Sequence, residues 1–158
     1  MEGSGNCIYV GSDNTHVLVD IGISGKKMET GLNSLELTGR DLDGILITHE
    51  HSDHIKGLGV ISRKYGIPIY ATAGTVDAMV RTNALGKIPE GIFHEIQEDE
   101  PFMINDLKVN PFTIPHDAAQ PVGYRLEHEG HSVGIATDLG KYNDYIIENL
   151  QGLDALLL

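Results

Sequence analysis

Residues 49–54 read HEHSDH, with three histidines and two carboxylates in six positions. Few combinations of side chains this dense have a use other than binding metal. Imidazole and carboxylate ligands together suit borderline divalent ions such as zinc, and also accept iron and manganese. The cluster therefore predicts a metal site, and it is the most informative feature of the chain.

The cluster follows the apolar run 45–47, which is typical of a buried strand. Residues two apart in an extended segment point to the same side, so His49 and His51 can converge on one ion. Asp53 and His54 fall where the chain turns into a following helix, which directs them toward a second position. The start of that helix favours a bound hydroxide or an anionic substrate.

Two further segments carry suitable ligands after expected strands. His116 follows the run 111–115, and Asp138 follows the run 133–137. Alone, such residues are more often a hydrogen-bonded loop histidine and a turn or cap aspartate. They become candidate ligands because the six-residue cluster needs more ligands to complete its coordination.

Asp20 has two interpretations. It either starts a turn or is an outer carboxylate that orients a ligating histidine. The other histidines have no companion ligands at useful spacing and are expected to be surface or structural residues: His16, His94, His128 and His131.

Short apolar strands alternate with helical segments along the chain. Helices are expected over 24–37, 53–65, 75–85 and 142–150, with Gly66 ending the second. Strands are expected over 7–10, 16–19, 44–47, 67–70, 102–104, 107–113, 122–128, 132–136 and 155–158. This pattern predicts an α/β layered domain, in which ligands bind at the carboxyl ends of strands.

The bulk composition is that of an ordinary globular protein. The chain has 158 residues, of which 41% are hydrophobic and 22% charged, enough for one domain with a real core. We expect no membrane association, because no run approaches the ~18 apolar residues of a membrane span. The first residues lack the features of a signal peptide. A single cysteine, Cys7, fits a reducing compartment, so we expect a cytoplasmic protein.

The formal net charge of −12 bears on the choice of partner. Nucleic-acid-binding proteins usually carry a basic surface, because neutralising phosphates supplies much of their affinity. The charge thus argues against nonspecific binding to duplexes. Bound divalent ions can reverse the sign of the charge locally, so the bulk charge does not exclude a phosphate-containing substrate.

The motifs resemble those of the metallo-β-lactamase superfamily along essentially the whole chain. Residues 48–54 resemble its H-x-H-x-D-H signature, and residues 18–22 its upstream aspartate motif. Residues 115–121 and 136–140 resemble its third and fourth motifs. The stretches 4–6, 42–48, 54–58 and 116–121 are most similar to the YycJ/WalJ branch, whose members are described as 5′-to-3′ exonucleases on double-stranded DNA.

The resemblance implies an αββα sandwich, of which this chain would supply the N-terminal half and part of the second sheet. It also implies two divalent ions, zinc being the first choice. The implied ligands of the first ion are His49, His51 and His116. Those of the second are Asp53 and His54, with Asp138 bridging the two ions, and the implied catalytic residues are Asp53, His116 and Asp138.

The bridging aspartate argues against β-lactamase activity, because the lactamase branch has a cysteine there. Phosphodiesterase and thioesterase branches have an aspartate. Family members also continue beyond the length of this chain and supply a late histidine to the second ion. We therefore expect residues 1–158 to form a single domain that is incomplete at its C-terminus, with a weak second metal position.

The leading functional hypothesis is metal-dependent hydrolysis of a phosphodiester, with a nucleic acid or a small phosphodiester as substrate. A glyoxalase-II-like thioesterase would use the same ligands on a carbonyl group. A third hypothesis is a metal-binding fragment with little or no catalysis. In that case the apolar run 155–158 would favour association, including homo-oligomers through an uncovered strand.

Overall fold

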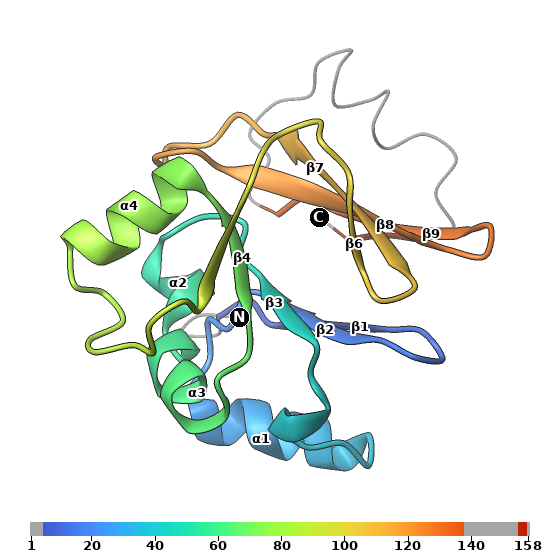
Figure 1. Ribbon diagram of the computed structural model, residues 1–158, viewed down its shortest axis with the longest axis horizontal. Coiled ribbons are helices and arrows are strands. Elements are labelled where there is room, and N and C mark those ends of the chain that lie inside the picture. Colours follow the sequence, from blue (N-terminus) through green and yellow to red (C-terminus); the bar gives the residue numbers. More distant parts are fainter. Residues whose placement is uncertain (1–4, 138–154, 158) are drawn as a thin grey trace.

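Two five-stranded sheets pack face to face in the computed structural model, which describes residues 5–137 and 155–157 (Figure 1). The first sheet has the strand order β1-β2-β3-β4-β5, and the second has the order β10-β9-β8-β7-β6. The helices lie along the outer side of the first sheet. The described residues thus form helix, sheet and sheet layers, which confirms the predicted α/β layered class.

The first sheet places the predicted metal cluster at one of its ends. Its strands β2, β3, β4 and β5 run parallel, and β1 pairs antiparallel with β2. The carboxyl ends of the parallel strands therefore share one edge, and the HEHSDH segment follows β3 there. The strands are β1 (Ile8–Gly11), β2 (His16–Val19), β3 (Gly44–Leu46), β4 (Ile69–Thr72) and β5 (Phe93–Ile96).

The second sheet brings the loop that carries His116 to the same edge. Four of its strands are antiparallel neighbours, and β10 pairs parallel with β9. The loop 114–121 joins β7 to β8, and the Val122 amide donates to the Thr48 carbonyl at 3.0 Å. The strands are β6 (Phe102–Ile104), β7 (Leu107–Thr113), β8 (Val122–His128), β9 (His131–Ile135) and β10 (Ala155–Leu157).

Most helix ends in the described part of the chain have identifiable caps. The Ser24 side chain accepts from the Lys27 amide, the Thr72 side chain accepts from the Thr75 amide, and Gly66 ends α3 with φ 65°. None of the described helices is long and apolar enough to cross a bilayer. The helices are α1 (Gly25–Ser34), the 3₁₀ turn η1 (Gly39–Asp41), α2 (Ser52–Ile55), α3 (Leu58–Tyr65) and α4 (Ala73–Arg81).

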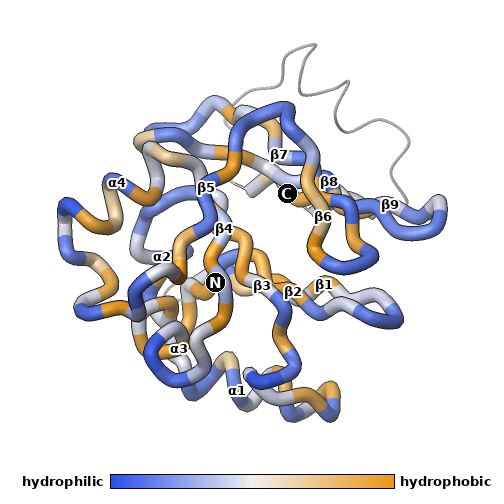
Figure 2. Tube along the Cα trace, viewed as in Figure 1, coloured by the Kyte–Doolittle hydropathy of each residue, from blue (hydrophilic) through white to orange (hydrophobic). Residues whose placement is uncertain are grey.

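The central strands β2, β3 and β4 of the first sheet are buried on both faces, which explains their continuous apolar runs. Side chains alternate along each strand, so neighbours enter different layers. Leu18 and Ile45 pack with the helices, whereas Val17, Val19 and Leu46 pack against the second sheet. The central strands are accordingly the most apolar part of the trace in Figure 2.

The predicted helix over 53–65 is wrong in one respect, because it is broken into α2 and α3 at Gly57. The Gly57 amide donates to the Ile21 carbonyl at 2.9 Å instead of continuing the first helix. A Cβ at this position would lie 2.3 Å from the Ile23 carbonyl oxygen. The close approach of residues 21–23 therefore requires glycine and divides the two helices.

Other boundaries differ by a few residues. The first helix ends at Ser34 and not near residue 37, because Glu36 takes a left-handed conformation with φ 62°. The strand predicted over 67–70 lies two residues later, and the next helix covers 73–81. Strand β5 was not predicted, since two of its four side chains, His94 and Glu95, are exposed. The helix predicted over 142–150 lies outside the described residues.

We expect Gly57→Ala to destabilise the protein by about 1–3 kcal/mol, because the new methyl group meets backbone that cannot move aside easily. Gly31→Ala is the matched control. Gly31 lies inside α1, and a Cβ there would have nothing within 4 Å, so alanine should stabilise the protein by up to about 1 kcal/mol. Urea unfolding of the two variants measures both effects. Equal effects of the two substitutions would refute the role assigned to Gly57.

Candidate metal centre

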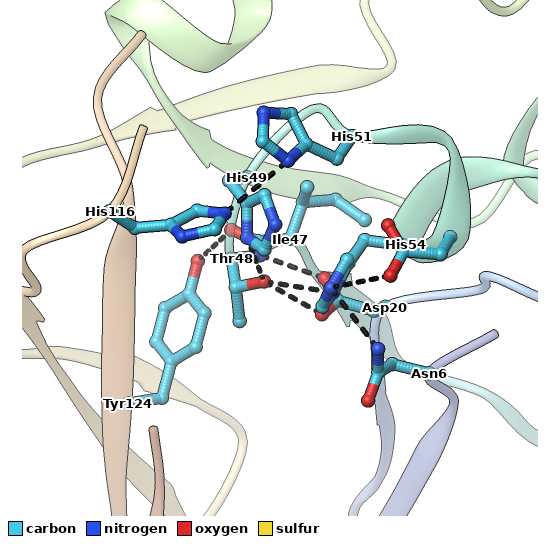
Figure 3. Close-up of polar contacts among 10 residues, drawn as sticks. Asn6, Asp20, Ile47, Thr48, His49, His51, His54, His116 and Tyr124 are labelled. Atoms are coloured by element: carbon cyan, nitrogen blue, oxygen red, sulfur yellow. Dashed lines mark hydrogen bonds and ion pairs between the residues drawn. The ribbon is translucent and has the colours of Figure 1, made fainter. Parts of the chain in front are cut away.

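Three histidines from the two sheets meet at the shared edge (Figure 3). His49 and His51 come from the segment after β3, and His116 comes from the loop between β7 and β8. One ring nitrogen of each lies within 4.8 Å of those of the other two. The Nε2 atom of His116 is 3.3 Å from the Nδ1 atom of His51. The structure thus brings together the three residues predicted for the first metal position.

The environment keeps His49 in the form that binds metals. His49 is fully buried, whereas His51 and His116 are half-buried. Burial lowers the pKa of His49 to about 3. Its neighbours His54, His116 and His51 add to this shift, because a protonated neighbour repels a further positive charge. His49 is therefore neutral at pH 7, and neutral imidazole is the ligating form.

Asp20 is the organising carboxylate behind this cluster. It is buried, and its backbone is left-handed with φ 64°. Its Oδ1 atom accepts from the Thr48 amide at 2.8 Å, and its Oδ2 atom accepts from the Thr48 hydroxyl at 2.7 Å. The Nδ1 atom of His54 lies 2.6 Å from Oδ2. Of the two interpretations of Asp20, this geometry fits the carboxylate that orients a histidine.

These contacts fix the ring tautomers. Because the Thr48 hydroxyl donates its proton to Asp20, its oxygen can accept from Nδ1 of His49, which lies 3.0 Å away. Nδ1 of His54 likewise donates to Asp20. A neutral ring with its proton on Nδ1 carries its lone pair on Nε2, so both rings offer Nε2 as a ligand atom. Burial raises the pKa of Asp20, whereas the hydrogen bonds from His54 and Thr48 oppose that rise.

The predicted second metal position is next to the first. The rings of His49 and His54 have centroids 3.9 Å apart. Nε2 of His54 lies 3.6 Å from Oδ2 of Asp53, whose side chain is 57% exposed. The Asn6 amide nitrogen is 3.1 Å from the same His54 atom. Asp138, the predicted bridging ligand, lies outside the described residues, so its role stays a prediction.

Sequence reasoning missed two contacts of this cluster. The Asn6 side chain contacts His54, which is 48 positions away in the sequence. The Glu50 side chain contacts the Ala119 amide, which is 69 positions away. Both residues fall inside stretches that carry the family resemblance, which is the only sequence signal that could have drawn attention to them. Neither has a spacing that distinguishes it from a surface residue.

His128 has acidic neighbours in the structure, which is compatible with the surface or structural role expected for it. Asp13 and Glu129 lie close to His128. One nitrogen or oxygen atom from each of these three side chains lies within 4.8 Å of the other two. Asp13 comes from the turn between β1 and β2, so no local spacing could reveal it. Both acidic residues are exposed, and the ring nitrogens of His128 lie 3.6 Å from an Asp106 carboxylate oxygen and 3.7 Å from a Glu129 carboxylate oxygen.

The pKa of His49 predicts how the stability of the metal-free protein depends on pH. The folded value is about 3, and an unfolded histidine has a pKa of ~6.5. Between these values the unfolded chain binds a proton that the folded chain lacks, so stability falls as the pH falls below about 6.5. The expected loss is about 1 kcal/mol between pH 6 and pH 5. Urea unfolding in excess chelator measures it.

The matched variant is His49→Gln, which removes this titration. Its unfolding free energy should depend less steeply on pH over that interval, because unfolding of the variant takes up roughly one proton fewer. Equal slopes for the two proteins would contradict the neutral, buried state assigned to His49.

Comparison with known proteins places this site in a family. Residues 15–158 match the family model described as the beta-lactamase superfamily domain. The chain is 39% identical to exodeoxyribonuclease YycJ of Bacillus anthracis over 154 residues, which are 98% of this chain and 58% of that protein. It is 40% identical to exodeoxyribonuclease WalJ of Streptococcus pneumoniae, over 94% of this chain and 56% of that protein. The chain thus spans little more than half the length of these relatives.

Solved structures show the same fold at low identity. Zn²⁺-bound PqqB from Methylobacterium extorquens superposes with a TM-score of 0.79 at 18% identity, covering 97% of this chain and 59% of the other. The metallo-β-lactamase fold protein YhfI from Bacillus subtilis also gives 0.79, at 21% identity, covering 98% and 63%. The two packed sheets therefore form a metallo-β-lactamase fold, and the chain belongs to the β-lactamase superfamily.

Proposed function

We propose that this protein is a metal-dependent phosphodiesterase of the nuclease type. The observation that carries the proposal is the convergence of three imidazoles from two sheets, one of them held neutral by burial. The relatives named as exodeoxyribonucleases support a nucleic-acid substrate. Those relatives are longer, so their activity is part of the proposal.

The donor set suits two divalent ions. His49, His51 and His116 would hold the first ion, and Asp53 and His54 would hold the second, with Asp138 shared between them. Nitrogen and carboxylate ligands favour zinc and also accept manganese or iron. When bound, such ions act as Lewis acids and supply hydroxide from water near neutral pH.

The residues around the proposed ions would orient water and hold the ligating rings in place. Asp53 has an exposed carboxylate beside His54, so its Oδ2 atom can orient the attacking water and accept its proton. His116 reaches in from the second sheet and closes the cluster from the opposite side. Asp20 and Thr48 hold the rings of His54 and His49 so that Nε2 of each carries the lone pair that would bind an ion. In His54 an ion would replace the contact of Nε2 with the Asn6 amide nitrogen, which lies 3.1 Å away.

The acidic chain makes the proposed ions the means of attracting a phosphate group. With a net charge of −12, long-range electrostatics oppose the approach of a polyanion. Ions held by the cluster would supply local positive charge, which would offset the negative charge of a phosphoryl group there. The charge therefore predicts substrate binding that depends strongly on the metals. From the resemblance to the exodeoxyribonuclease relatives, we propose 5′-to-3′ cleavage of DNA ends as the reaction.

We expect His51→Ala to lose metal from the first position and to reduce phosphodiester hydrolysis by more than about 100-fold. A direct ligand should matter at least as much as the outer contacts that cost ~10–100-fold in metal sites. Metal analysis after dialysis and hydrolysis of bis(p-nitrophenyl) phosphate and 5′-labelled duplex DNA give the two readouts. The control is His94→Ala, which removes an exposed histidine of β5. Full turnover by wild-type protein stripped of metal would refute the proposal.

Asp138→Ala tests the bridging role. At a Zn²⁺ concentration that fills both positions of wild-type protein, loss of Asp138 should lower the bound metal from about two to about one equivalent and strongly reduce turnover, because a ligand shared by both positions would be gone. The first position should stay occupied. Unchanged stoichiometry in this variant would remove Asp138 from the ligand set.

A further inference from the structure

Glu50 lies between two proposed ligands in the sequence, but its carboxylate contacts a different segment. The ring nitrogens of His49, His51 and His116 converge, and Glu50 is not part of that group. Its Oε2 atom accepts from the Ala119 amide at 3.0 Å. Ala119 is three residues after His116, so this bond joins the two segments that carry the histidine group.

The far end of the His116 loop has its own anchors. The Gln120 side chain accepts from the Gly74 amide at 2.7 Å and donates to Glu98 at 2.8 Å. The Val122 amide bonds to the Thr48 carbonyl at 3.0 Å. These contacts fix where the loop enters β8. Nearer to His116, the loop meets the HEHSDH segment through the His116 ring, 3.3 Å from Nδ1 of His51, and through the hydrogen bond from the Ala119 amide to Glu50.

His116 needs such support more than His49 does. His49 is fully buried and bonded to Thr48, whereas His116 is half-buried on a loop between strands. Within the loop, the Ala118 amide donates to the His116 carbonyl at 3.0 Å. Together with the Glu50 bond to Ala119, this makes a short link from the HEHSDH segment to the His116 backbone.

We propose that Glu50 is a positioning residue that holds the 116–121 loop, and with it His116, within coordinating distance of His49 and His51. The inference rests on the proposed function only in taking the three histidines as a metal site. It adds that metal affinity depends on a carboxylate that is not itself a ligand. It requires nothing of the substrate.

The test compares Zn²⁺ affinity in Glu50→Ala, Glu50→Gln and Glu90→Ala, measured by competition with a chelating dye. Glu50→Ala should weaken binding by about 10–100-fold, as for other outer contacts in metal sites. Glu50→Gln keeps an oxygen that can accept from Ala119, so its affinity should stay within about threefold of wild type. Glu90→Ala removes an exposed carboxylate elsewhere and should change nothing.

A second readout follows the hydrogen bond itself. Amide exchange at Ala119 should quicken about tenfold or more in Glu50→Ala and stay near the wild-type rate in Glu50→Gln. Adding Zn²⁺ to wild-type protein should slow the same amide, because a bound ion fixes His116. The comparison with and without Zn²⁺ uses wild-type protein and so does not depend on the folding of any variant.

Two results would overturn the proposal. One is wild-type Zn²⁺ affinity in Glu50→Ala. The other is equal loss in Glu50→Ala and Glu50→Gln, which would make the charge responsible and not the loop contact. Failure of the proposed phosphodiesterase is distinguishable, since it would appear as Zn²⁺ binding by wild-type protein without hydrolysis of DNA or of bis(p-nitrophenyl) phosphate.

Discussion

The buried carboxylate of Asp20 is the contact on which the rest of the site depends. It joins the end of β2, the segment after β3 and the short helix α2, because its two oxygens accept from Thr48 and His54. Backbone hydrogen bonds join the same three segments. The Asp20 amide donates to the Leu46 carbonyl, and the Ile21 amide donates to the His54 carbonyl, each at 2.8 Å. One local network therefore links the end of β2, the segment after β3 and α2, and it orients the ring of His54.

This network has a cost that the surrounding structure must offset. A non-glycine residue in the left-handed region is strained by about 1 kcal/mol or more, and a buried carboxylate is stable only when its oxygens are hydrogen-bonded. Apolar packing on both faces of the first sheet supplies the opposing stability. Strained, fully bonded polar groups of this kind concentrate at functional sites, which agrees with the position of Asp20 behind the histidines.

The sequence predicted the parts of the site that are local and left out those that depend on close approach. The spacing of His49 and His51 implied a shared direction, and the strand before them implied the edge of the sheet. His116 was found because it also follows a strand. Gly57 looked like an ordinary helix residue, since only the passage of residues 21–23 at 2.3 Å excludes a side chain there. Asn6 and Glu50 were missed for the same reason, because their partners are distant in the sequence.

The proposed histidine site spans both sheets, so metal binding there would be coupled to sheet packing. His49 and His51 follow a strand of the first sheet, and His116 follows a strand of the second. An ion held by all three would bind only when the sheets are packed, and it would therefore stabilise the folded state by mass action. The apolar layer between the sheets, which includes Val19, Leu46 and Val122, keeps the two loops in register before any ion arrives. Because this layer assembles the site, the ligand atoms are already close together and little ordering remains to oppose metal binding.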